Sequence, residues 1–224
     1  MANPATLLLE QFTRWHRPGN HTATDARVPD TDRWREHRLA IKHVEAIEQL
    51  LNEMSERGRN VAVYQGAWPI WCAAVFAYPQ GWSNAGTAAL DGARLDLLEV
   101  LAERLDDFVP AVNSDGLEQL RGYTHEVRET LDGDDSLPDE LRAHMRRVIE
   151  HLEWCVEHYA QAGDFELREA TDRLAAAVIR AGASTRHQDR WKKAMNDFVW
   201  PFTVNVVASI PGTALAQLVL GAGS

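Results

Sequence analysis

Charged residues are missing from the end of this chain. Residues 198–224 contain none, whereas all 33 acidic and 23 basic residues lie upstream. Exposed apolar surface on this scale is unusual in a monomer, so the segment must be buried against its own domain, a partner or lipid. Pro201 and Pro211 divide it into pieces shorter than the roughly twenty apolar residues that span a bilayer. We expect it to complete the domain, to self-associate, or to make conditional membrane contact, and the residues leave these three open.

Cysteine is scarce as well. Cys72 and Cys155 are too few for a disulfide framework, which indicates a reducing compartment. The first residues lack the basic region and the apolar run of a signal peptide. We therefore expect a cytoplasmic protein.

Basic residues are outnumbered, and the formal net charge is −10. Binding to the phosphate backbone relies on clustered lysine and arginine, so we expect no nucleic-acid partner. The same balance argues against adsorption to anionic lipid through a basic patch.

Common catalytic signatures are also absent. The chain has no P-loop, G-x-G-x-x-G, G-x-S-x-G, H-E-x-x-H or C-x-x-C motif. This argues against the nucleotide-dependent and serine-hydrolase classes. We expect a protein that is not an enzyme and has no cofactor, the alternative being one that holds a divalent metal such as zinc.

Helical periodicity is what the sequence has in abundance. It predicts an all-α fold, an antiparallel helical bundle-like domain of about seven helices over residues 1–197, followed by the charge-free segment 198–224. Asn3 and Pro4 predict a capped first helix, and Gly58 predicts the end of a long second one. Gly163-Asp164 predicts the end of one later helix and the cap of the next.

The stretch 61–82 is harder to assign, because it is charge-free and rich in aromatic residues. Pro69 could begin a short buried helix reaching Phe76, but periodicity does not distinguish this from a buried strand. Trp68, Trp71 and Trp82 are expected in the core, since no charged residue lies among them.

A metal site is one candidate for chemistry. His43 lies on the apolar side of its predicted helix, and Glu140 and His144 are one helical turn apart on another. If the two helices pack face to face, these residues form a His₂Glu set with an open position, suited to zinc. The alternative is a buried, hydrogen-bonded His43 and an ordinary surface pair.

Three histidines spaced by seven residues, His144, His151 and His158, form a stripe beside the apolar face of one helix. Cys155 could chelate a metal together with His151 or with His158. We expect instead a polar border between core and solvent, because a ligand set confined to one helix is rarely complete.

Aromatic and apolar side chains provide the last candidate. Trp154 lies opposite the apolar seam of its helix, where a neighbour must cover it. The predicted contact residues are Trp154, Trp200, Phe202, Val206 and Leu218. The preferred function is therefore a non-enzymatic helical interaction protein that binds a protein partner or forms a homo-oligomer. The alternatives are a membrane-acting, toxin-like effector that releases its C-terminal segment, and a metal-dependent helical-bundle enzyme.

Overall fold

The computed structural model describes residues 2–15, 21–22, 31–76, 85–86 and 92–202, and over these ranges the protein is all-α apart from one pair of two-residue strands. The helices belong to two compact units, Met1–Asp107 and Phe108–Ser224. The sequence patterns gave no boundary within residues 1–197. The division falls three residues before Pro110, which cannot continue the preceding helix.

In the described residues of the first unit, four helices and the strand pair pack together. Helix α1 packs on α3 and α5, and α4 packs on the same two helices. Strand β1 pairs antiparallel with β2, with His21 opposite Gly86. The elements are α1 (Pro4–Trp15), β1 (His21–Thr22), α3 (Thr31–Glu56), α4 (Ala62–Phe76), β2 (Ala85–Gly86) and α5 (Gly92–Asp106).

Helix α1 is capped and anchored by one side chain. Asn3 Oδ1 accepts hydrogen bonds from the amides of Ala5 and Thr6, each at 3.0 Å, which satisfies two of the free N–H groups of the first turn. Asn3 Nδ2 donates to the carbonyl of Ala102 and to Asp106 Oδ1 on α5, at 2.9 and 2.7 Å. The predicted cap is confirmed, and it also ties α1 to the end of α5.

Helix α4 begins earlier than predicted. The sequence suggested a start at Pro69, but the helix starts at Ala62 and contains Pro69 in its interior. A proline there removes one backbone hydrogen bond, and its exposed position leaves the freed carbonyl of Gln65 on the exposed side of the helix. The expected core placement is confirmed for Trp71, whose ring is fully buried and donates to the Arg94 carbonyl. Trp82 lies outside the described residues.

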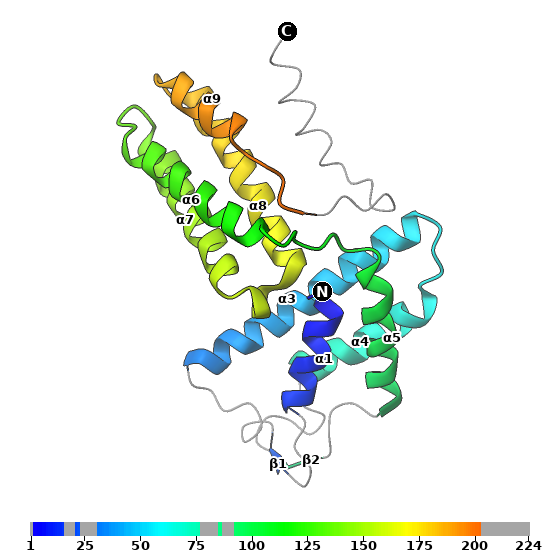
Figure 1. The fold of residues 1–224 in the computed structure, drawn as a ribbon. Helices are drawn as coiled ribbons and strands as arrows, with labels where there is room; N and C mark the ends of the chain where they lie inside the picture. Colours follow the sequence, from blue (N-terminus) through cyan, green and yellow to red (C-terminus); the bar gives the residue numbers. More distant parts are fainter. Residues whose placement is uncertain (1, 16–20, 23–30, 77–84, 87–91, 203–224) are drawn as a thin grey trace. The chain divides into compact units, whose positions relative to one another are not determined.

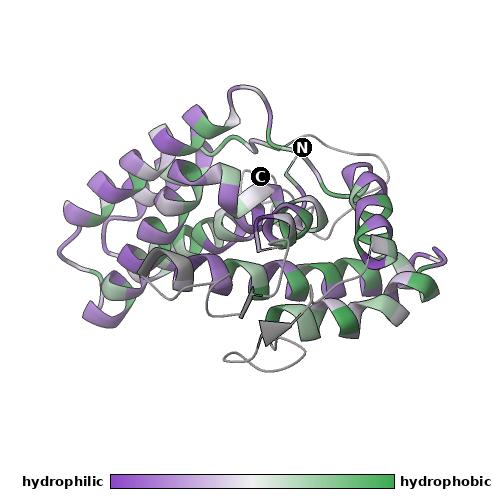
Figure 2. Ribbon diagram, turned by 90° about the horizontal axis from the view of Figure 1, so that it is seen from below, coloured by the Kyte–Doolittle hydropathy of each residue, from purple (hydrophilic) through white to green (hydrophobic). Residues whose placement is uncertain are grey.

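Over residues 108–202, the second unit is a bundle of four helices, α6 (Gly116–Asp132), α7 (Asp139–Glu157), α8 (Tyr159–Ser184) and α9 (Gln188–Asn196). Successive helices pack on one another, and α9 also returns to α6, so the four lie side by side (Figure 1). The helices carry polar residues on one side and apolar residues on another (Figure 2), as the sequence periodicity predicts.

Gly163 interrupts α8 at the predicted break, with φ of 73°, a left-handed conformation that favours glycine. Asp164 follows it and is buried. Its Oδ1 accepts hydrogen bonds from the Tyr159 hydroxyl at 2.6 Å and from the Val112 amide at 2.8 Å. Burial, and then the Asp164 carboxylate, raise the pKa of Tyr159 above its usual range. This contact fixes the segment that enters α6 against the start of α8.

Candidate functional site

The predicted His₂Glu metal set is divided between the two units. His43 lies on α3 in the first unit and is buried, whereas Glu140 and His144 lie on α7 in the second. Glu140 is exposed in the first turn of α7, and His144 is half-buried. Each residue is therefore placed only within its own unit, and the metal set formed by the three stays a prediction.

The start of the charge-free segment docks on the second unit. An aromatic row runs from Tyr123 on α6 through Phe198 and Trp200 to Phe202, with ring centroids 4.9, 6.2 and 5.1 Å apart in turn. Phe202 is 2% exposed and forms an isolated antiparallel bridge with Val112. Within residues 198–202, Pro201 and Phe202 are thus buried in the second unit, whereas Val199 is 62% exposed. Residues 203–224 lie outside the described residues, so the placement of the segment as a whole stays a prediction.

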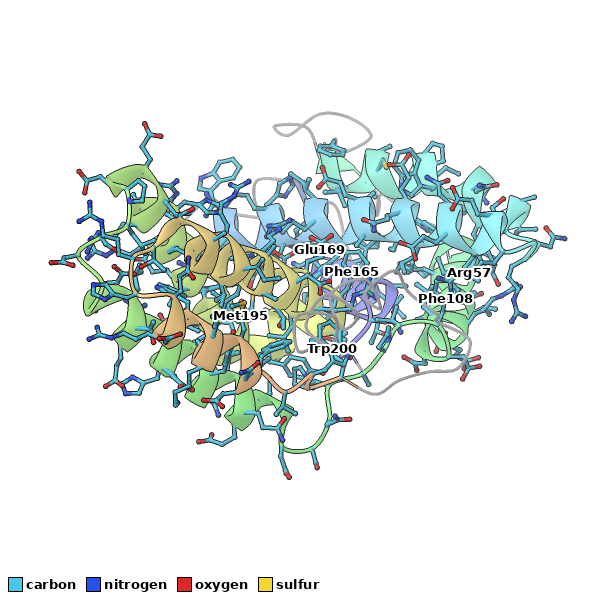
Figure 3. All side chains as sticks on the ribbon, turned by 90° about the horizontal axis from the view of Figure 1, so that it is seen from above. Arg57, Phe108, Phe165, Glu169, Met195 and Trp200 are labelled. Carbon is cyan, nitrogen blue, oxygen red and sulfur yellow. The ribbon has the colours of Figure 1, made fainter. Side chains whose placement is uncertain are left out.

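Two of the predicted contact residues keep part of their surface exposed. Trp154 is half-buried against the core and stacks on the His158 ring, with centroids 5.0 Å apart. Trp200 is likewise partly buried, as is Met195 on the preceding α9 (Figure 3). Phe202, in contrast, already packs within its own unit. Val206 and Leu218 lie outside the described residues.

The histidine stripe on α7 lies at an intermediate depth, as expected of a polar border. His158 Nδ1 is 3.1 Å from the Trp154 carbonyl, so this nitrogen is engaged with the backbone of its own helix. His151 is different, because its Nε2 lies 3.0 Å from Glu166 Oε1 on α8 and 3.9 Å from Cys155 Sγ. The packing of α8 on α7 thus adds Glu166 to His151 and Cys155, the pair that the sequence suggested as possible metal ligands.

Glu166 was missed by sequence reasoning, although a signal was present. It lies one helical turn before Ala170 and directly before Leu167, which places a carboxylate at the edge of the apolar seam of α8. The residue is only 9% exposed. A buried carboxylate needs partners, and His151 on the facing helix is one of them.

A second polar cluster joins the loop between α6 and α7 to the end of α8 and to α9. Asp134 is fully buried, and its two oxygens accept four hydrogen bonds. Oδ1 accepts from the amide and the hydroxyl of Ser136, at 2.9 and 2.7 Å. Oδ2 accepts from the Thr185 hydroxyl at 2.5 Å and from Trp191 Nε1 at 2.8 Å. We call these four residues the Asp134 clasp.

The clasp holds Asp134 in its ionised form. Burial by itself would raise the pKa of this carboxyl, but the hydrogen bonds from Thr185, Trp191 and Ser136 outweigh it and hold the pKa well below its usual range. The clasp is therefore a structural element of the bundle, since each carboxylate oxygen is already occupied by two donors.

This shift predicts an acid-dependent loss of stability. Above the ordinary aspartate pKa of about 3.9, the ionised clasp contributes fully. As the pH falls below that value, the unfolded chain takes up the proton first, so the contribution declines until folded Asp134 is also protonated. We expect the difference in unfolding free energy between wild type and Asp134→Asn to shrink below about pH 4. Chemical unfolding of both proteins at a series of pH values measures it, and a difference that stays constant into this range contradicts the prediction.

Helix α4 presents an uncharged surface away from its buried side. Its buried face contains Tyr64, Ala67, Trp71, Ala74 and Val75. The opposite side is exposed or half-buried, and we call it the outer face of α4; it consists of Ala62, Val63, Gln65, Gly66, Pro69, Ile70, Ala73 and Phe76. Val63 is 64% exposed and Phe76 54%. The helix contains no charged residue, and the outer face is apolar apart from the amide of Gln65.

No family model matches this chain, and the searches of curated proteins and of solved structures also gave no match. Among the described residues, none of the helices combines the length and the apolar character needed to cross a membrane.

Proposed function

We propose that this protein is a non-enzymatic interaction protein that self-associates through the outer face of α4. The observation that carries the proposal is the combination of exposure and missing charge on this helix. An amphipathic surface helix normally turns charged residues to the solvent, but α4 has none and exposes Val63 and Phe76 beside Gln65. Contiguous apolar surface of this kind is typical of protein–protein contacts.

The small side chains of this face favour a helix as the occupant. Ala62, Gly66, Pro69, Ala73 and Phe76 follow one another at steps of four and three residues, which keeps them on one seam of the helix. Alanine and glycine allow a facing helix to approach closely, and the larger apolar side chains are Phe76 at the end of the seam and Val63 beside it.

The net charge favours a second copy as that occupant. Two chains that each carry a charge of −10 repel one another over most of their surfaces. A face without charges is where this repulsion is weakest and where apolar burial is gained. Two copies of α4 can then form a two-fold symmetric contact, in which the same face of each chain meets the other.

Substitution of Val63 and Phe76 by lysine tests the proposal. We expect wild type to form dimers that dissociate on dilution, and Val63→Lys/Phe76→Lys to weaken the dimer by about a hundredfold, because two apolar contacts are lost and charges are buried in their place. Sedimentation equilibrium over a range of protein concentrations measures the dissociation constant.

Val100→Lys is the matched control. Val100 on α5 is 51% exposed, but it is surrounded on its helix by the exposed acids Asp96, Glu99 and Glu103. Lysine at this position should leave the dissociation constant unchanged. A wild-type chain that stays monomeric at high concentration, or an equal effect of the α5 substitution, would overturn the proposal.

A further inference from the structure

Three potential metal ligands of different chemistry meet within the second unit. His151 and Cys155 lie one turn apart on α7, and Glu166 reaches them from α8. One ligand atom of each, Nε2, Sγ and a carboxylate oxygen, lies within 4.8 Å of the other two. We propose that His151, Cys155 and Glu166 form a binding site for a zinc-class divalent metal ion.

The spacing of the ligand atoms fits a tetrahedral ion. Zinc bonds of about 2.0–2.1 Å to nitrogen and oxygen, and of about 2.3 Å to sulfur, place neighbouring ligands about 3.3 Å apart for N and O and about 3.6 Å apart for N and S. The corresponding distances here are 3.0 Å between His151 Nε2 and Glu166 Oε1, and 3.9 Å between His151 Nε2 and Cys155 Sγ. The third pair, Cys155 Sγ and a Glu166 carboxylate oxygen, lies within 4.8 Å, so side-chain movements of up to about 1 Å bring the three ligand atoms to the bonded geometry.

The donor set selects the kind of metal. Imidazole and thiolate are preferred by zinc and by the later first-row transition metals, whereas magnesium and calcium require oxygen ligands. Cys155 binds as the thiolate, and its proton passes to the solvent when the metal enters. Three protein ligands leave a fourth position of the tetrahedron for water or for an external ligand.

The two helices hold the ligands on a rigid scaffold. Leu152 and Val156 on α7, and Leu167 and Ala170 on α8, are at most 2% exposed and belong to the core shared by these helices. The ligands lie at the margin of that core. The side chain of His151 is 28% exposed and that of Glu166 is 11% exposed, so an ion can enter from the His151 side without unfolding of the bundle.

The other group with comparable ligand spacing in the described residues does not offer the same chemistry. It consists of Asp134, Asp135 and His187. Both oxygens of Asp134 already accept hydrogen bonds within the clasp, and the Asp135 side chain is 97% exposed. This group therefore provides a control for non-specific binding.

Cobalt is the appropriate probe, because Co²⁺ substitutes for zinc and reports on its ligands. Full-length protein is reduced, freed of metal with a chelator, and titrated with Co²⁺ and then with Zn²⁺. We expect one equivalent of Co²⁺ to bind with tetrahedral absorption bands and a near-ultraviolet band from the cobalt–thiolate bond, and Zn²⁺ to displace it. Zn²⁺ should also raise the melting temperature, because it binds the folded chain.

Cys155→Ser should abolish the thiolate band and weaken Zn²⁺ binding by more than about tenfold. Substitution of a residue that only orients a metal ligand typically causes a loss of that size, so loss of a ligand should cost at least as much. Cys72→Ser is the matched control and should change neither result. Cys72 lies in the first unit, and burial, and then the charge of Glu48, raise its pKa to about 11, which opposes the thiolate that a metal requires. His187→Ala should bind like wild type.

Glu166→Gln keeps the volume of the side chain and tests the site independently of the buried cysteine. It should retain the thiolate band and bind Zn²⁺ more weakly than wild type, with an unchanged circular dichroism spectrum. The proposal is overturned if wild type binds no metal, if Cys155→Ser folds and keeps the band, or if Glu166→Gln binds Zn²⁺ as tightly as wild type.

Discussion

Asp134→Ala is expected to lower the free energy of unfolding by about 3 kcal/mol. The substitution leaves Trp191 Nε1 without its acceptor inside the protein, and it removes the acceptor that orients Thr185 and Ser136. A buried donor left without a partner costs about 1–3 kcal/mol, and the clasp contains more than one. The loop between α6 and α7 would also lose its attachment to the end of α8. Urea unfolding followed by circular dichroism measures the change.

The neighbouring residue provides the control for this experiment. Asp135→Ala is the same type of substitution, but the Asp135 side chain is 97% exposed, so the change in unfolding free energy should stay within about 0.5 kcal/mol. Equal losses from the two substitutions would show that the hydrogen bonds of the clasp contribute no net stability.

Gly116→Ala is expected to destabilise the second unit by about 2 kcal/mol, although alanine is the better helix former. A Cβ at position 116 would lie 2.5 Å from Val112 Cγ2 and 2.7 Å from the Pro201 carbonyl oxygen. The second atom belongs to the backbone and accepts a hydrogen bond from the Asn113 amide at 2.8 Å. The added methyl group must therefore push away the strand-like contact that holds residues 201–202 against residues 112–113.

Gly122→Ala, in the same helix, is the matched control and should have the opposite sign. A Cβ at position 122 meets no atom within 4 Å, so alanine there should raise the unfolding free energy by about 0.5–1 kcal/mol. Amide hydrogen exchange at Asn113 should become faster in Gly116→Ala and stay unchanged in Gly122→Ala. Stabilisation by both substitutions would contradict the close approach of Pro201 to the start of α6.

Much of the local structure could be predicted from the residues themselves. Asn3 was predicted as a cap and is one, and Gly58 and Gly163 take the left-handed backbone that ends or interrupts a helix. Gly58 lies just beyond the end of α3, and its amide donates a hydrogen bond to the Ser55 carbonyl in the last turn, as expected at a helix C-terminus. These features depend on interactions between residues close in sequence, which the chain itself specifies.

Prediction of a helix start from neighbouring residues failed where the burial of a whole helix outweighed the local preference. Pro69 was predicted to begin a helix, yet α4 runs through it. The helix is stabilised by Trp71 and the other buried residues of its inner face, and this packing compensates for the hydrogen bond that proline removes. Periodicity could not reveal that the outer face is exposed either, because α4 has apolar residues on both sides and no charged residue to mark the exposed one.

The sequence by itself determined that this protein is a helical one, where its principal helix breaks lie, and that His151 and Cys155 lie on one side of one helix. Only the tertiary structure decided that Glu166 joins them, that Asp134 is the centre of a buried clasp, and that Phe202 packs in the core. The physical reason is that spacing along a chain fixes which residues share a helix face. Which faces meet depends instead on how the helices rotate and pack against one another to bury their apolar sides.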